Sequence, residues 1–332
     1  MINGHGDDAY HYPEGITTDF SSNICPHADH SLLMAHLAAI GTQLIGHYPE
    51  PEAWTLEQML ADRHGISPQN VIVTSGATEA IYLVAQAFRL RPVIPVPTFS
   101  EYRDASKLFP CTDRKHSICW LCNPNNPTGQ VYDHNLIEHL TEKHDLVVID
   151  QSYESYTKQF LFAPRWACRL PNVIQIHSMT KTYAVPGVRI GYITAPLCLT
   201  RILRRYLRPW SVGGFAVEAG KFLLQHNELI QRPDFNETMR LWHALNTIDG
   251  ITVMPTHTNF MLGKIRSEKQ VTSSELKDYL ARQHRLLIRD ASNFRGLSPY
   301  HFRVATQSPG ENDALVSAIS LFLTHHSAKT AK

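Results

Sequence analysis

The chain has 332 residues, 43% of them hydrophobic and 18% charged, so we expect a globular protein with one large and one smaller domain. Its formal net charge of +1 argues against a general nucleic-acid or membrane partner. No stretch approaches the roughly 18 continuous apolar residues of a membrane helix. The polar start Met1–Tyr12 is not typical of a signal peptide. A cytoplasmic protein is therefore expected.

The six cysteines show no spacing typical of a disulfide framework. Cys119 and Cys122 form a C-x-x-C pair, which can indicate a metal or redox site. They fall, however, in an expected buried strand, where residues three apart point to opposite faces. No second pair supplies further ligands, and no H-E-x-x-H sequence occurs. We therefore expect no metal.

Residues 1–30 are expected to form an extended arm, because Pro13, Gly15 and Pro26 interrupt them. Short β-branched runs then alternate with helical patterns, which predicts a doubly wound α/β domain with a mostly parallel sheet over residues 31–235. The expected strands are Val71–Thr74, Val93–Val96, Ile118–Cys122, Leu146–Ile149, Val173–Ile176 and Ile190–Thr194. The expected helices are Trp54–Arg63, Thr78–Arg89, Asn135–Lys143 and Leu199–Leu207.

After about residue 235 the pattern changes to helices mixed with a few short strands. This predicts a smaller α+β domain over residues 236–332, which the N-terminal arm joins. The expected helices are Glu237–Asn246, Ser273–Gln283 and Asn312–Leu323, and the expected strands are Thr252–Met254, Asn259–Leu262, Leu286–Ile288 and Phe302–Ala305.

Five expected strands are followed directly by polar or turn-forming segments. These segments are Ser75–Glu79, Pro97–Phe99, Asn123–Gly129, Asp150–Tyr153 and Ser178–Lys181. Ligands of open α/β sheets bind beyond the carboxyl ends of the strands. Turn chemistry explains any one segment, but five in succession predict a shared site.

Lys181 lies among small residues, with Ser178 three positions before it and Arg189 eight after it. A lone lysine is usually a solvated surface residue, but a lysine whose pKa is lowered by burial and nearby cations forms imines with carbonyl cofactors. This segment resembles the Schiff-base motif of the fold-type-I pyridoxal-phosphate enzymes, the superfamily of the class I/II aminotransferases. The resemblance implies that Lys181 binds pyridoxal 5'-phosphate covalently.

The remaining motifs follow in the order of that family and span nearly the whole chain. Amides at a helix N-terminus attract a phosphate, and an arginine adds charge-assisted hydrogen bonds. The groups that the resemblance assigns to the cofactor phosphate are Gly76, Ala77, Thr78, Ser178 and Arg189. Tyr48 matches a tyrosine that reaches this phosphate from the neighbouring subunit, which implies a homodimer with shared active sites; alone, Tyr48 is only a turn aromatic.

The resemblance also assigns the groups around the cofactor ring. Asp150 would keep the ring nitrogen protonated, so that the ring acts as an electron sink. Asn126 and Tyr153 would bind the phenolic oxygen. Phe99 would stack on the ring, with Tyr102 as the alternative. Without the resemblance, a helix cap and core aromatics explain these residues equally well.

Two members of the superfamily that use phosphorylated substrates look similar: L-threonine O-3-phosphate decarboxylase of cobalamin synthesis and histidinol-phosphate aminotransferase. Arg303 matches the arginine for the substrate carboxylate, and Arg289 matches a phosphate-binding arginine of both members. The segments that resemble the decarboxylase are Asp19–Pro26, His5-Gly6, Pro209–Val212, Ser292–Leu297 and Tyr300–Ala305.

The expected reaction is therefore decarboxylation of L-threonine O-3-phosphate to aminopropanol phosphate, with Lys181 or Tyr48 as the proton carrier. His5 and Asn23 would join Arg289 at the substrate phosphate, and Asn126 would join Arg303 at the carboxylate.

Two departures from the family pattern bear on the substrate. Asp7 replaces the second glycine of the decarboxylase's H-G-G segment, and the segment from Phe99 to Cys122 is short. A histidinol-phosphate or related amino-acid aminotransferase is the alternative function. A non-catalytic pyridoxal-phosphate-binding regulator is a further alternative, although the expected domains leave no segment for a DNA-binding module.

Overall fold

The computed structural model describes residues 6–330, and its largest sheet has six strands in the order β2-β7-β6-β5-β4-β3. Neighbours from β3 to β6 pair in parallel, and β7 runs antiparallel to both β6 and β2. The mostly parallel α/β sheet predicted from the sequence is therefore confirmed. Its strands are β2 (Val71–Thr74), β3 (Leu90–Val93), β4 (Asp113–Cys122), β5 (Leu146–Asp150), β6 (Val173–His177) and β7 (Gly191–Thr194).

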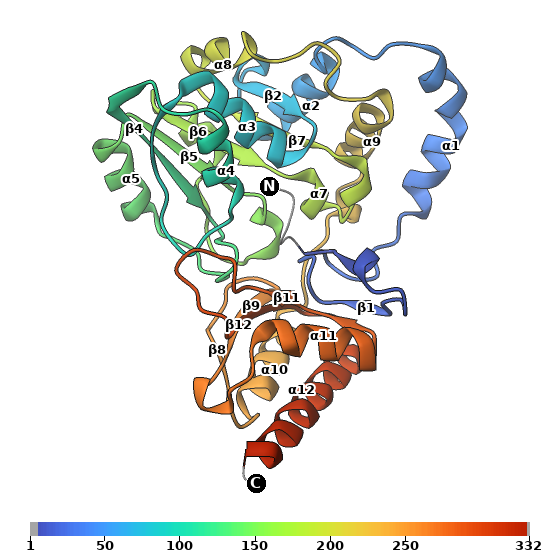
Figure 1. The fold of residues 1–332 in the computed structure, drawn as a ribbon. Helices are drawn as coiled ribbons and strands as arrows, with labels where there is room; N and C mark the ends of the chain where they lie inside the picture. Colours follow the sequence, from blue (N-terminus) through green and yellow to red (C-terminus); the bar gives the residue numbers. More distant parts are fainter. Residues whose placement is uncertain (1–5, 331–332) are drawn as a thin grey trace.

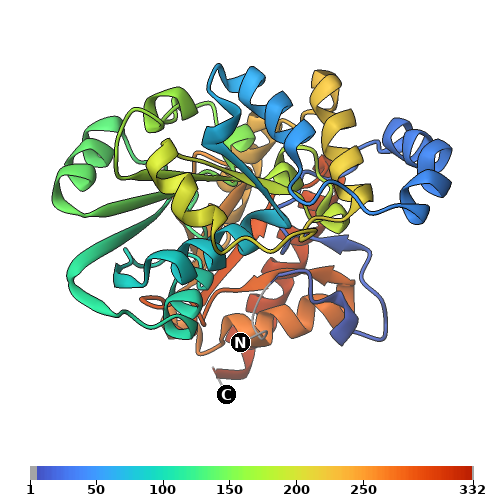
Figure 2. The same cartoon turned by 90° about the horizontal axis from the view of Figure 1, so that it is seen from above.

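Helices cover both faces of this sheet (Figures 1 and 2). In β5, Val148 packs into the apolar cluster of one face, whereas Val147 and Ile149 pack into a cluster of the other. Cys119 and Cys122 likewise lie in different clusters, as expected of strand residues three apart. The helices are α1 (Ser31–Gly46), α2 (Trp54–His64), α3 (Gly76–Phe88), α4 (Glu101–Leu108), α5 (His134–Lys143), α6 (Pro164–Ala167), α7 (Met179–Thr182), α8 (Leu197–Arg204) and α9 (Gly214–Gln225).

A second sheet has four antiparallel strands in the order β11-β12-β9-β8 and packs against three helices (Figure 1). Its strands are β8 (Ile251–Val253), β9 (Phe260–Ile265), β11 (Arg289–Asp290) and β12 (His301–Ala305). The helices are α10 (Phe235–Asn246), α11 (Ser273–His284) and α12 (Pro309–Thr330). Among residues 6–330, no helix has the length and apolar character needed to cross a membrane.

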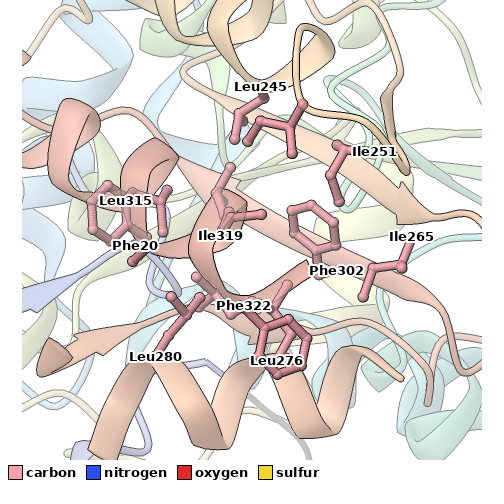
Figure 3. Close-up of a cluster of buried hydrophobic side chains, with 14 of the residues drawn as sticks. Phe20, Leu245, Ile251, Ile265, Leu276, Leu280, Phe302, Leu315, Ile319 and Phe322 are labelled. Carbon is pink, nitrogen blue, oxygen red and sulfur yellow. The ribbon is translucent and has the colours of Figure 1, made fainter. Parts of the chain in front are cut away.

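The N-terminal arm docks on this second layer. Its strand β1 (Thr18–Asp19) pairs in parallel with β10 (Leu286–Leu287). Phe20 follows directly and is fully buried with Leu315 and Ile319 (Figure 3). The Phe20 amide donates to Leu287, and its carbonyl accepts from Ala305. The arm is thus an integral part of the C-terminal layer, while the domain boundaries at residues 30 and 235 stay a prediction.

The second expected strand, Val93–Val96, differs most from the sequence prediction. The apolar run Val93–Val96 is interrupted by Pro95, and the strand instead occupies Leu90–Val93 at the edge of the sheet. Pro92 has no amide hydrogen to donate, and an edge strand tolerates this because its outer side pairs with no other strand. The expected strand Leu286–Ile288 ends one residue early as β10, which pairs with the arm, and a separate strand, β11, follows it and joins the second sheet.

We predict that Phe20→Ala lowers the free energy of unfolding by about 3–5 kcal/mol, because it leaves a cavity where the arm meets the core. Tyr10→Ala is the matched control, since Tyr10 lies on the same arm with 76% of its surface exposed. Chemical denaturation measures both. A loss below about 0.5 kcal/mol for Phe20→Ala, the range of surface substitutions, would contradict this account of the arm.

Candidate active site

A single cavity collects residues from the arm, from the carboxyl ends of the large sheet's strands and from the second sheet. The residues that line it are Gly6, Asp7, Ser21, Ser22, Ile24, Ala77, Thr78, Phe99, Ser100, Tyr102, Cys122, Asn126, Asp150, Ser152, Tyr153, Ser178, Thr180, Lys181, Pro186, Arg189, Arg289, Phe294 and Arg303. All five polar segments expected to converge contribute to this lining. The convergence follows from the parallel strands, whose carboxyl ends meet at one edge.

Lys181 lies in the short helix α7, which follows β6, and it is only partly exposed to solvent. Its Nζ donates to the carbonyl of Ser22 at 3.0 Å. Burial lowers the pKa of Lys181 to about 7, helped by the nearby cations Arg303 and Arg189 and opposed by carboxylates of the arm. A substantial fraction of the amine is therefore neutral and nucleophilic at neutral pH.

An anion site forms where α3 begins. Gly76 has φ +81°, and a Cβ placed on it would lie 2.6 Å from Nη2 of Arg189, so a side chain at this position would displace the guanidinium. The guanidinium thus lies against the helix N-terminus, and Ala77 and Thr78 at that end line the cavity. Unpaired amides, the helix dipole and a fixed positive charge suit a phosphate.

Asp150 ends β5 and is buried. Its Oδ1 accepts from the amide and hydroxyl of Ser152 at 2.9 and 2.6 Å, and its Oδ2 accepts from the Tyr102 hydroxyl at 2.8 Å. Burial raises the pKa of Asp150, while these hydrogen bonds oppose the rise. A cation facing this carboxylate from the cavity would lower its pKa again, so the arrangement favours a cationic group of a ligand.

Two hydrogen-bonded pairs include residues that line the cavity, namely Arg303 with Asn126, and Tyr153 with Asn23. Arg303 donates to Oδ1 of Asn126 at 2.5 Å, and Nδ2 of Asn23 donates to the Tyr153 hydroxyl at 3.3 Å. Nε of Arg303 and Oδ1 of Asn23 are buried and have no hydrogen-bond partner within residues 6–330. Unpartnered buried polar atoms are rare in native proteins, so a bound polar group fits here.

The arginines on β11 and β12 are direct cross-strand neighbours, since Arg289 is the register partner of Arg303. Both are buried. Arg289 donates to Asn293 at 2.7 Å, and burial together with Arg303 lowers the pKa of Arg289 to about 10. Two adjacent buried cations repel each other and favour a ligand with two anionic groups.

Of the predicted site residues within residues 6–330, most line this cavity, and three do not. Gly76 lies behind the Arg189 guanidinium, and Asn23 is fully buried behind Tyr153. Tyr48 is 87% exposed, and its ring lies beside that of Trp210 with centroids 5.5 Å apart. His5 lies outside the described residues.

The structure adds one role that the sequence did not indicate. Tyr102, considered only as an alternative stacking residue, is fully buried and holds Asp150 through its hydroxyl, while Phe99 lines the cavity beside it. The two rings meet edge to face with centroids 5.8 Å apart. No local pattern marks this contact, because 48 positions separate Tyr102 from Asp150.

The family model for aminotransferases of class I and II matches residues 16–115 and 108–319. The chain belongs to the class I and II aminotransferase family. The two matched stretches overlap at residues 108–115. This overlap falls in the short segment between Phe99 and Cys122, which leads into β4, the neighbour of the edge strand β3.

Three known proteins illustrate the similarity. An L-threonine-O-3-phosphate decarboxylase structure from Porphyromonas gingivalis is 36% identical with a TM-score of 0.86, covering 92% of this chain and 99% of that chain. A histidinol-phosphate aminotransferase from Caldanaerobacter subterraneus is 28% identical, covering 83% of this chain and 84% of the relative. A histidinol-phosphate aminotransferase from Sinorhizobium meliloti, solved with pyridoxal-5'-phosphate, is 18% identical with a TM-score of 0.80, covering 95% and 93%, a likeness that shows the fold alone.

We predict that acylation of Lys181 in the ligand-free protein has its pH midpoint near the pKa of about 7, because only the neutral amine reacts. Peptide mass spectrometry after a pH series measures it. The midpoint should rise in Arg303→Gln, which removes a nearby cation, and should reach about 10.4 in the unfolded chain. A midpoint near 10 in the folded protein would contradict the described environment of the amine.

Proposed function

We propose that this protein is a pyridoxal-phosphate-dependent decarboxylase that converts L-threonine O-3-phosphate to aminopropanol phosphate, a step of cobalamin synthesis. The observation that carries the proposal is the pair of buried arginines, Arg289 and Arg303, beside the amine of Lys181. A phosphorylated amino acid presents the two anions and the amine that such a pocket suits. The 36% identity to a threonine-phosphate decarboxylase supports this substrate.

The residues present fit pyridoxal 5'-phosphate. Lys181 would hold the cofactor through its amine, Arg189 with the start of α3 would bind the phosphate, and Asp150 would face the ring nitrogen. Phe99 would cover the ring. When bound, the cofactor supplies an electron sink for the bond that breaks at the substrate's α-carbon.

The chain's own residues would select which bond breaks. Arg303 and Asn126 would hold the substrate carboxylate, while Arg289 would hold the distal phosphate. Of the two further ligands expected for that phosphate, Asn23 is fully buried, donates to Tyr153 and does not line the cavity, and His5 lies outside the described residues. Binding energy at both ends fixes the rotation of the substrate about its α-carbon. The Lys181 amine, with Tyr48 as the alternative, would carry the proton that replaces the carboxylate.

A homodimer with shared sites is part of the proposal. Tyr48 is exposed, and α1 stands at the periphery of the molecule in both views (Figures 1 and 2). Three large apolar side chains of α1, Leu32, Met34 and Ile45, are at least half exposed. A second subunit would cover them and receive Tyr48. A monomer in light scattering that is fully active would contradict this.

Two assays on the cofactor-loaded protein test the reaction. L-threonine O-3-phosphate alone should yield carbon dioxide, whereas histidinol phosphate with 2-oxoglutarate should yield no glutamate. Glutamate without carbon dioxide would replace the proposal with the aminotransferase. Loss of both activities in a protein that retains cofactor would favour the non-catalytic regulator. A cytoplasmic location belongs to the same proposal.

We predict that Arg289→Ala weakens binding of L-threonine O-3-phosphate by about 1.5–3 kcal/mol, because a charged hydrogen bond is lost. This corresponds to about 10- to 150-fold in the dissociation constant. Arg282→Ala is the matched control, since Arg282 pairs with Glu14 on the surface. Unchanged affinity in Arg289→Ala would remove the phosphate assignment.

A further inference from the structure

Tyr156 joins the N-terminal arm to Lys181 from outside the cavity. It ends the 3-10 helix η3 (Glu154–Tyr156), which follows Asp150, and it is fully buried. Its hydroxyl accepts from the amide of Cys25 at 3.0 Å and donates to the carbonyl of Lys181 at 2.7 Å. An amide only donates and a carbonyl only accepts, so both roles of the hydroxyl are fixed. Because Tyr156 does not line the cavity, it acts on a ligand only through its neighbours.

Lys181 is thereby held to the arm at both of its ends. Its Nζ donates to the Ser22 carbonyl at 3.0 Å, and its own carbonyl is linked through Tyr156 to Cys25 further along the arm. The Lys181 carbonyl also accepts from the amide of Ala184 at 3.2 Å. For the Cys25 amide, in contrast, Tyr156 is the one acceptor within residues 6–330. Loss of the hydroxyl would therefore leave a donor of the arm unpaired, which favours a displaced arm.

Packing and burial keep this bridge in place. The ring of Tyr156 lies in an apolar cluster with Cys25, Tyr153, Phe260 and Ala305, which come from the arm, from the segment after β5 and from the second sheet. Burial raises the pKa of Tyr156 above its usual range, so the hydroxyl keeps the hydrogen that it donates. The bridge therefore does not itself titrate near neutral pH.

The position of the arm decides how far the Lys181 amine is covered. The titratable and charged groups that face this amine are Arg303 of β12, Arg189, Asp7 and Asp19 of the arm, and Tyr153, whose ring centroid lies 5.7 Å from Nζ. A displaced arm would admit water to the amine, which raises the pKa of Lys181, and would take away the two arm carboxylates, which lowers it. Burial is the largest cause of the lowered pKa, so the net effect of displacement is a rise.

We propose that Tyr156 is a positioning residue, whose hydroxyl ties the arm to the backbone of Lys181 and so holds the Ser22 carbonyl against the Lys181 amine. The bridge keeps the arm closed over the reactive amine and touches no ligand itself. This inference rests on the proposed function only in taking Lys181 as the reactive amine. It assigns a role to a tyrosine that belongs neither to the family motifs nor to the lining of the cavity.

The test uses Tyr156→Phe in the full ligand-free chain, because this change removes the hydroxyl and keeps the packed ring. Loss of the hydrogen bond should raise the population of the displaced arm about threefold to tenfold. The amide hydrogens of residues 18–24 should then exchange with deuterium faster by the same factor. The protonated amine favours the displaced arm, where water reaches it. The pH midpoint for acylation of Lys181 should therefore rise from about 7 by about half a unit to one unit.

Tyr192→Phe is the matched control. Tyr192 is also buried, does not line the cavity, and its hydroxyl pairs with His64 at 2.8 Å. This variant should leave both the midpoint and the exchange of the arm unchanged. Faster exchange with an unchanged midpoint in Tyr156→Phe would mean that the hydroxyl holds the arm without positioning the amine, and would overturn the proposal. No change in either measurement, or an equal rise of the midpoint in Tyr192→Phe, would overturn it as well.

The outcome is separable from that of the proposed function. If the cofactor-loaded wild-type protein releases no carbon dioxide from L-threonine O-3-phosphate, the decarboxylase proposal fails, while the comparison of midpoints still decides the role of Tyr156. If the midpoint of the wild-type protein is near 10, the amine is not covered by the arm, and the inference about Tyr156 fails whatever the activity.

Discussion

The site depends on keeping the Lys181 amine surrounded by protein and close to cations. Its carbonyl partner, Ser22, comes from the arm, and Arg303, the guanidinium that lowers its pKa most, comes from β12. Three segments distant in sequence therefore have to meet before the pKa of this lysine falls to about 7. The burial of Phe20 in the C-terminal core brings the arm to this place, which links the stability of that core to the chemistry.

The arginines beside the amine are costly for stability, because two buried cations on paired strands repel each other. Their pKa values are both lowered by burial. Hydrogen bonds to Asn126 and Asn293 offset part of this cost, but Nε of Arg303 stays without a partner within residues 6–330. Such an arrangement is understandable in a site that binds anions, where the ligand supplies the missing negative charge.

Much of the large sheet could be predicted from the sequence, because β2, β5 and β6 are short β-branched runs with clear ends. Helices α1, α4 and α9 were not predicted, and β3 was displaced because Pro95 interrupts the apolar run on which the prediction was based. The residues that converge on the cavity could also be predicted, from the segments that follow the strand ends and from the order of the family motifs. The role of Tyr102 and the pairing of Arg289 with Arg303 could not, since tertiary packing and strand register decide both.

The central claim is a covalent bond between the cofactor and one lysine, and the most direct measurement is peptide mass spectrometry of the purified protein after borohydride reduction. The account predicts that the reduced pyridoxal phosphate is found on the peptide that contains Lys181 and that the protein's visible absorbance disappears with reduction. A modification on another lysine, or a colourless protein that takes up no pyridoxal phosphate, would contradict it.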